Sequence, residues 1–200
     1  TAHAIGNAFR FCLKKQKARD FQPSRLFIYY NERVAIGTVE EDSGAQIRDG
    51  IKSVVKQGVV PESKWPYVVS KFAKKPAAAL YKEALEHQAL SYKRLPRTLE
   101  QMKGCLASGY PFVFGFSVYE SFESVAVAKS GKMPMPGKDD SLVGGHAVLA
   151  VGYDDKTKTI LVQNSWSTEW GRKGYFAMPY DYICDPELCD DFWTIRIVED

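Results

Sequence analysis

The 200-residue sequence predicts an α+β fold, with a helical first half followed by a sheet-rich second half. Apolar residues in the first half recur every three or four positions, as on one face of a helix. In the second half they alternate singly, as on a half-buried strand. The composition is 45% hydrophobic, 26% charged and 13% aromatic, which is typical of a folded globular chain and excludes disordered and fibrous classes. We therefore expect one compact unit with a helical lobe at residues 1–90 and a sheet lobe at residues 91–200.

The helical lobe is predicted from the spacing of its apolar residues. This spacing favours four helices, over residues 2–16, 24–34, 45–57 and 76–87. The first helix places Cys12 on its apolar face, so an inert, buried thiol is expected there. Gly58 is a stop signal for the third helix. Residues 88–97 are expected to form the crossover between the two lobes.

The sheet lobe begins with a helix that opens at the capping pair Thr98 and Gln101 and ends at Gly109. Alternating apolar residues then predict five strands, over residues 112–118, 147–153, 160–164, 174–178 and 192–198. The polar segment 154–159 is expected to join the second and third of these strands as a hairpin.

Charge and cysteine content exclude several classes of partner. The net charge of +3 arises from 27 basic and 24 acidic residues scattered along the chain, which is too weak for nucleic-acid binding. No apolar run approaches the roughly 20 residues that cross a bilayer, so no membrane partner is expected. The four cysteines lack the paired spacing of a zinc site, so no metal is expected. A disulfide between Cys184 and Cys189 stays open, as does the cellular compartment.

Two polar residues stand where packing does not require them. His146 follows two glycines at the mouth of one predicted strand, and Asn164 ends the next. If these strands form a hairpin, the two side chains stand almost opposite one another. The asparagine oxygen would then accept a hydrogen bond from one imidazole nitrogen and leave the other to act as a base. Trp166 would keep water away from this hydrogen bond.

These residues resemble the papain-like cysteine proteases, the family that includes the cathepsins. The resemblance rests on Gly-His-Ala-Val-x-x-Val-Gly-Tyr at 145–153, Asn-Ser-Trp at 164–166 and Trp-Gly-x-x-Gly-Tyr at 170–175. Weaker agreement comes from Gly58, Glu62 and Trp65-Pro66-Tyr67. The match extends over nearly the whole chain. It implies a two-lobed papain-like fold, in which a helical lobe packs against a twisted antiparallel, barrel-like sheet lobe with the active-site cleft between them.

The resemblance also implies the activity, a cysteine-type peptidase that hydrolyses peptide bonds without an organic cofactor. His146 would be the catalytic base and acid, and Asn164 would orient it. The family carries its reactive cysteine at the start of the first long helix, behind an oxyanion-hole glutamine. Because Thr1 aligns with the residue that follows this cysteine, the nucleophile is expected just before Thr1. A thiol at that helix end would ionise readily beside an imidazolium.

Substrate recognition is implied by the same resemblance. Ser43 and Gly44 occupy the place of the glycine pair that lines the family's main specificity pocket. Gly145, Ala147 and Trp166 complete the expected substrate site, and the small side chains at 145 and 147 favour an apolar substrate group. The expected partners are a peptide or protein substrate and an inhibitory pro-segment, and the protein is expected to be a monomer.

Other interpretations of the sequence lead to different functions. One alternative is a catalytically inactive papain-like protein that binds peptides or a partner. Another would use Thr1 as an N-terminal nucleophile, with its own amine as the base. The helix predicted from Ala2 argues against that second mechanism, because N-terminal nucleophile enzymes need an exposed first residue on a sheet core.

Overall fold

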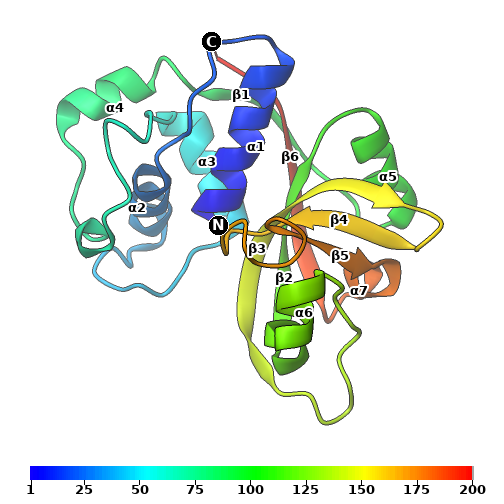
Figure 1. Cartoon of the computed structure of the whole chain (residues 1–200). Helices are drawn as coiled ribbons and strands as arrows, with labels where there is room; N and C mark the ends of the chain where they lie inside the picture. The colour runs from blue at the N-terminus through cyan, green and yellow to red at the C-terminus, as the bar shows by residue number, and fades with distance from the viewer. Residues whose placement is uncertain (200) are drawn as a thin grey trace. The chain divides into compact units, whose positions relative to one another are not determined.

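The computed structural model describes residues 1–199 and confirms the α+β fold (Figure 1). The chain forms two compact units. Unit 1 contains Thr1–Lys93 and the end of the chain from Trp193 onward, and unit 2 contains Arg94–Phe192. The final strand segment therefore belongs to the unit that holds the first helices. The division into functional lobes at residue 90 stays a prediction.

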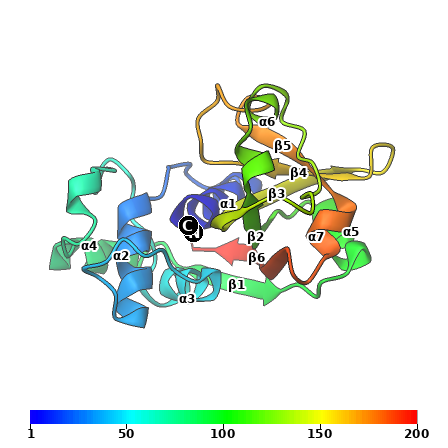
Figure 2. The same cartoon turned by 90° about the horizontal axis from the view of Figure 1, so that it is seen from below.

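Unit 1 is built mainly from helices, which are α1 (Ala2–Lys15), α2 (Arg25–Ile36), α3 (Ile47–Gln57) and α4 (Ala78–Ala84), with the 3₁₀ turn η1 (Val69–Lys71). Helices α1, α2 and α3 pack against one another (Figure 2). The buried apolar side chains of this unit include Ile5, Phe9, Phe27 and Ile51. Ser24 caps α2 by accepting a hydrogen bond from the Phe27 N–H.

The boundaries of three elements in unit 1 differ from those predicted. Helix α3 begins at Ile47, behind the cap residue Gln46, and α4 is shorter than the predicted helix at both ends. Residues 89–94, expected in the crossover, form the strand β1 (Ala89–Arg94). Four of its six residues are exposed, so the segment lacks the alternating burial by which a strand is recognised from sequence.

Unit 2 is organised around a sheet. Its elements are α5 (Leu99–Ala107), β2 (Phe112–Tyr119), η2 (Glu120–Glu123), α6 (Val125–Ser130), β3 (Leu142–Asp154), β4 (Thr159–Gln163), β5 (Tyr175–Pro179), α7 (Tyr180–Cys184) and the start of β6 (Cys189–Val198). The described strands follow the order β1-β6-β2-β3-β4-β5. Strands β2 to β5 pair antiparallel. Helix α5 packs on β3, and α7 packs on β4 and β5.

The predicted strand at 112–118 and the predicted hairpin are both present, as β2 and as β3 paired with β4. The capping pair is also present, because the Thr98 hydroxyl accepts a hydrogen bond from the Gln101 N–H at the start of α5. The core of this unit is aromatic, with Phe112, Phe114, Phe116, Phe122 and Phe176 all buried.

A buried arginine fastens the loop that follows α2. Arg33 is fully buried, and its guanidinium donates hydrogen bonds to the carbonyls of Val39 and Phe72, and to that of Glu41 at 3.3 Å. It also stacks on the ring of Tyr29, with its central carbon 4.1 Å from the ring centroid. These contacts hold the chain on the approach to Ser43 and Gly44.

Candidate active site

Pairing of β2 with β3 places His146 on the core-facing side of the sheet. His146 stands opposite Phe116, and residues directly opposite in an antiparallel pair share a face. Its ring meets the ring of Phe116 edge-on, with centroids 5.7 Å apart. The histidine therefore has a fixed backbone position and an aromatic support beside it.

Asn164 follows β4 and reaches the imidazole with its side chain. The Asn164 Oδ1 lies 2.9 Å from the Nε2 of His146. The Asn164 N–H donates to the Gly174 carbonyl at 2.9 Å, and the side chain is buried, with 8% of the residue exposed. His146, inside β3, and Asn164, directly after β4, thus come together although they are 18 positions apart in the sequence.

The hydrogen bonds of Asn164 determine which ring nitrogen carries the proton. The Ser165 N–H also donates to Oδ1, at 2.8 Å, and a backbone N–H can meet only an acceptor, so this atom is the amide oxygen. An oxygen beside Nε2 requires Nε2 to carry a hydrogen. Neutral His146 therefore keeps Nδ1 as its unprotonated nitrogen.

The two residues lie close to one another across the hairpin, but the pairing of β3 with β4 stops before it reaches them. The last paired residues are Leu149 and Gln163, and the register shifts between Ala150 and Gly152. Asn164 lies one position beyond this pairing, whereas His146 lies three positions before Leu149. Continued by one residue, this register places Asn164 opposite Val148, two positions from His146, and the asparagine side chain spans that difference.

Trp166 stacks on the imidazole. The two ring centroids are 5.2 Å apart and the ring planes are inclined by 21°. Trp166 is itself held by Trp170 and Phe122, at centroid distances of 5.2 Å and 5.5 Å. Burial lowers the pKa of His146, and the hydrogen bond that its ring donates to Asn164 Oδ1 partly opposes this shift. The environment therefore favours the neutral ring with Nδ1 available.

Gly145 and Ala147 lie on the opposite face of β3 from His146. Their partners on β2 are Ser117 and Gly115, so the four residues form a stripe of small side chains. A Cβ added at Gly145 would meet no other atom within 4 Å. The stripe leaves open space beside the strand that carries the histidine.

Ser43 and Gly44 belong to unit 1. Gly44 has a φ of +79°, which favours glycine, and its N–H donates to the Tyr29 hydroxyl at 3.1 Å. That hydroxyl in turn donates to Asp42 Oδ1 at 2.6 Å. The structure brings His146, Asn164 and Trp166 together within unit 2, and a substrate site that also includes Ser43 and Gly44 stays a prediction.

Several supporting residues were missed by the sequence analysis. The alternation of Phe114 and Phe116 predicts a strand but gives no indication that Phe116 meets the histidine. Tyr29 has no sequence signal that links it to Gly44. Glu62, part of the weaker motif, accepts from the Arg25 side chain at 2.7 Å and from the Tyr67 N–H at 2.6 Å. It therefore links α2 to the loop that contains Tyr67.

None of the four cysteines forms a disulfide, so Cys184 and Cys189 are not joined by the bridge that the sequence left open. Burial raises the pKa of the Cys12 thiol to about 11, as expected for an inert core residue. Among residues 1–199, no three His, Cys, Asp or Glu side chains gather in an arrangement suited to a metal ion. Within the same residues, no helix combines the length and apolar character of a membrane span.

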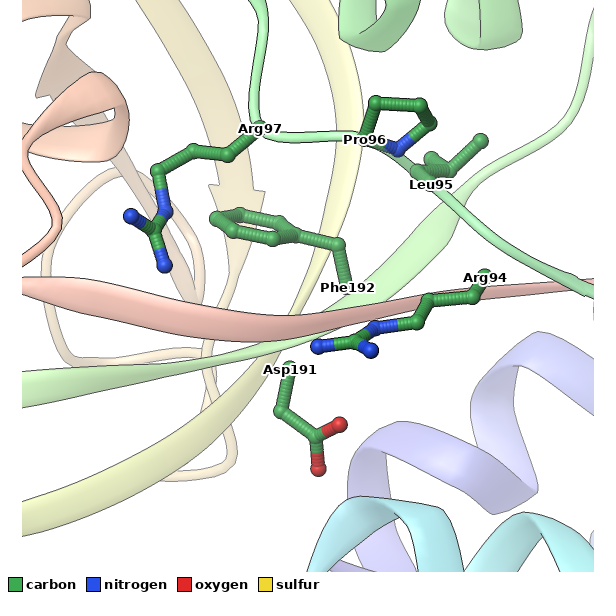
Figure 3. A pocket seen from close by; sticks show the side chains of 6 residues that line it. All are labelled: Arg94, Leu95, Pro96, Arg97, Asp191 and Phe192. Atoms are coloured by element: carbon green, nitrogen blue, oxygen red, sulfur yellow. The ribbon is translucent and has the colours of Figure 1, made fainter.

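A hollow of about 300 Å³ lies elsewhere in unit 2, between the end of β1 and β6 (Figure 3). It is lined by Arg94, Leu95, Pro96, Arg97, Asp191 and Phe192. Its lining carries charges of both signs, and it includes none of His146, Asn164 and Trp166. It is therefore separate from the candidate active site.

A histidine whose ring is hydrogen-bonded to an asparagine is an arrangement by which thiol-dependent hydrolases can hold a catalytic base, and His146 and Asn164 have this arrangement in an α+β chain. Comparison with known proteins specifies the family. The family model described as papain family cysteine protease matches residues 39–189. The chain belongs to the papain family of cysteine proteases.

Individual relatives agree with this assignment. An uncharacterized peptidase C1-like protein of Acanthamoeba polyphaga mimivirus is 47% identical, over 100% of this chain and 67% of its own length. Xylellain, a cysteine protease from Xylella fastidiosa, is 45% identical in a solved structure, with a TM-score of 0.93 over 98% of this chain and 78% of its own.

Procathepsin B from Trypanosoma congolense shares the fold at 20% identity, with a TM-score of 0.73 over 100% of this chain and 68% of that one. The structural neighbours thus include a proenzyme. A cathepsin B-like cysteine proteinase of Ostertagia ostertagi is 36% identical over 49% of this chain and 54% of its own length. The chain therefore spans between about half and four fifths of these relatives.

Proposed function

We propose that this protein hydrolyses peptide bonds with a thiolate and imidazolium pair, in which Asn164 orients His146 and the thiol precedes Thr1. The observation that carries the proposal is the hydrogen bond of 2.9 Å between Asn164 Oδ1 and His146 Nε2. It leaves Nδ1 as the nitrogen that can take a proton from a thiol. Burial raises the pKa of the Cys12, Cys184 and Cys189 thiols, which makes these three poor nucleophiles.

The reaction then follows from the positions of the protons. The thiol transfers its proton to His146 Nδ1, and the thiolate attacks the carbonyl carbon of the substrate. The tetrahedral intermediate collapses as the imidazolium protonates the leaving amine, which gives a thioester. His146 next removes a proton from water, the resulting hydroxide attacks the thioester, and the thiol leaves with the proton. Backbone N–H groups at the start of α1 would stabilise the oxyanion.

The substrate part of the proposal rests on small side chains. Gly145 and Ala147 present little bulk beside the strand that carries His146, which suits an apolar substrate side chain. Gly44 would pair with the extended substrate backbone through its carbonyl, since its N–H is taken by the Tyr29 hydroxyl. Ser43 would narrow the entrance to the specificity pocket. Trp166 would form the side of the substrate site next to the imidazole. A pro-segment would act as an inhibitor by occupying the same positions.

The test is to read the gene upstream of Thr1, express the longer chain, and treat it with an epoxide that alkylates reactive thiols. We expect one covalent adduct, on a cysteine directly before Thr1 and on none of Cys12, Cys105, Cys184 and Cys189. His146→Ala should abolish the adduct. Peptide binding without labelling would instead support the alternative function, an inactive papain-like binding protein.

A further inference from the structure

A carboxyl group is buried beneath the start of α1. Glu32, on α2, is fully buried, with 0% of the residue exposed. Its Oε2 accepts a hydrogen bond from the Thr1 hydroxyl. Its Oε1 is buried and has no hydrogen-bond partner among the described residues. Burial of a carboxyl group with only one of its oxygens hydrogen-bonded is costly, so the position requires an explanation beyond packing.

Helix α3 leaves room for this carboxyl group. A Cβ added at Gly50 would lie 2.2 Å from Glu32 Oε1 and 2.3 Å from Ile5 Cδ1. Gly50 lies inside the helix and has no positive φ, so backbone conformation does not require glycine there. A glycine inside a helix costs about 1 kcal/mol relative to alanine. The glycine therefore serves to admit the carboxyl group between α1, α2 and α3.

Few charges face this group. Burial raises the pKa of Glu32 to about 7. The Thr1 amino group and hydroxyl and the Arg33 guanidinium oppose the shift, whereas Asp49 on α3 adds to it. Arg33 is not an ion-pair partner, since it donates its hydrogen bonds to backbone carbonyls. In a longer chain a peptide bond would replace the Thr1 amino group, which would leave the carboxyl still easier to protonate.

We propose that Glu32 is a positioning residue for the reactive thiol: it anchors Thr1, fixes the start of α1, and weakens the nucleophile when it ionises. This inference rests on the proposed function, which places the thiol on the residue before Thr1. A carboxylate next to a thiolate disfavours it by like-charge repulsion, whereas a neutral carboxyl group does not. The thiol is therefore most easily ionised while Glu32 keeps its proton.

The experiment uses the full chain with its upstream residues. The rate of alkylation by iodoacetamide is measured across pH for the wild type, for Glu32→Gln and for the exposed control Glu40→Gln. Glutamine can still accept from Thr1 but cannot ionise. We expect Glu32→Gln to be alkylated faster than the wild type above pH 7, by up to about threefold while the thiol is still partly protonated, which corresponds to a fall of about half a unit in the thiol pKa. The control should match the wild type.

Thr1→Val separates anchoring from charge. It keeps the carboxyl group and removes only the hydrogen bond, so we expect kcat to fall several-fold while KM changes little. Superimposable alkylation curves for the wild type and Glu32→Gln, with labelling intact, would overturn this inference alone. Absence of any epoxide-reactive thiol upstream of Thr1 in the wild type would instead overturn the proposed function, and this inference with it.

Discussion

The hydrogen bond between Asn164 and His146 restricts the imidazole in two ways. It holds the hydrogen on Nε2, and together with the stacked Trp166 it limits rotation of the ring. A histidine with the same burial but no such partner would sample both tautomers. The asparagine thus contributes orientation rather than charge, and its removal should affect the rate more than substrate binding.

This role predicts the effect of Asn164→Ala. We expect kcat to fall tenfold or more, an effect of about 1.4 kcal/mol or greater, because the imidazole loses both its fixed tautomer and its ring angle. Hydrolysis of a fluorogenic peptide at saturating concentration measures the change. Ser165→Ala is the matched control, since the backbone N–H of residue 165 still donates to Asn164 Oδ1. An unchanged kcat would remove Asn164 from the mechanism.

At the scale of the elements, the loop after α2 is held by one buried side chain. The Arg33 guanidinium donates hydrogen bonds to carbonyls of the loop after α2, and it also donates to the carbonyl of Phe72, which lies 39 positions away in the sequence. The arginine thus links segments of unit 1 that are distant in the sequence through hydrogen bonds.

Arg33→Met should therefore destabilise unit 1 by about 3 kcal/mol, because several buried carbonyls would lose their donors. The measurement is urea unfolding at neutral pH. Arg25→Met is the control, because Arg25 forms a partly buried ion pair with Glu62 and should cost about 1 kcal/mol. Equal losses in the two variants would contradict a special role for Arg33.

The end of helix α3 was predictable from the sequence. Gly58 ends α3 with a φ of +73°, and a Cβ there would lie 1.7 Å from the Ala84 carbonyl oxygen. The stop signal in the sequence thus corresponds to a real steric requirement. Strand β1 was not predictable, since its ladder partner is the last strand of the chain and its own residues lack alternation.

For the whole molecule, two buried titratable groups oppose one another in the pH dependence of stability. The pKa of Glu32 is raised to about 7, so its contribution is present at low pH and is lost as pH rises through about 7. The pKa of His146 is lowered, so its contribution is present above about pH 6.5 and is lost as pH falls below that value.

The free energy of unfolding measured from pH 4 to 8.5 should respond to each group separately. Glu32→Gln should flatten the decline toward neutral pH, and His146→Gln should flatten the decline on the acid side. Parallel curves for the wild type and both variants would show that neither pKa differs between the folded and unfolded states. The measurement uses the chain that starts at Thr1, because a thiolate beside His146 would raise the pKa of the imidazole.

The sequence alone determined the fold class, most of the helices and strands, the family and the pairing of His146 with Asn164. Each of these depends on local periodicity, turn residues or motifs of a few neighbouring positions. Tertiary structure alone decided the tautomer of His146, the acceptors of Arg33, and the space that Gly50 leaves for Glu32. These features depend on atoms contributed by residues distant in the sequence, and no local pattern encodes which distant groups will meet.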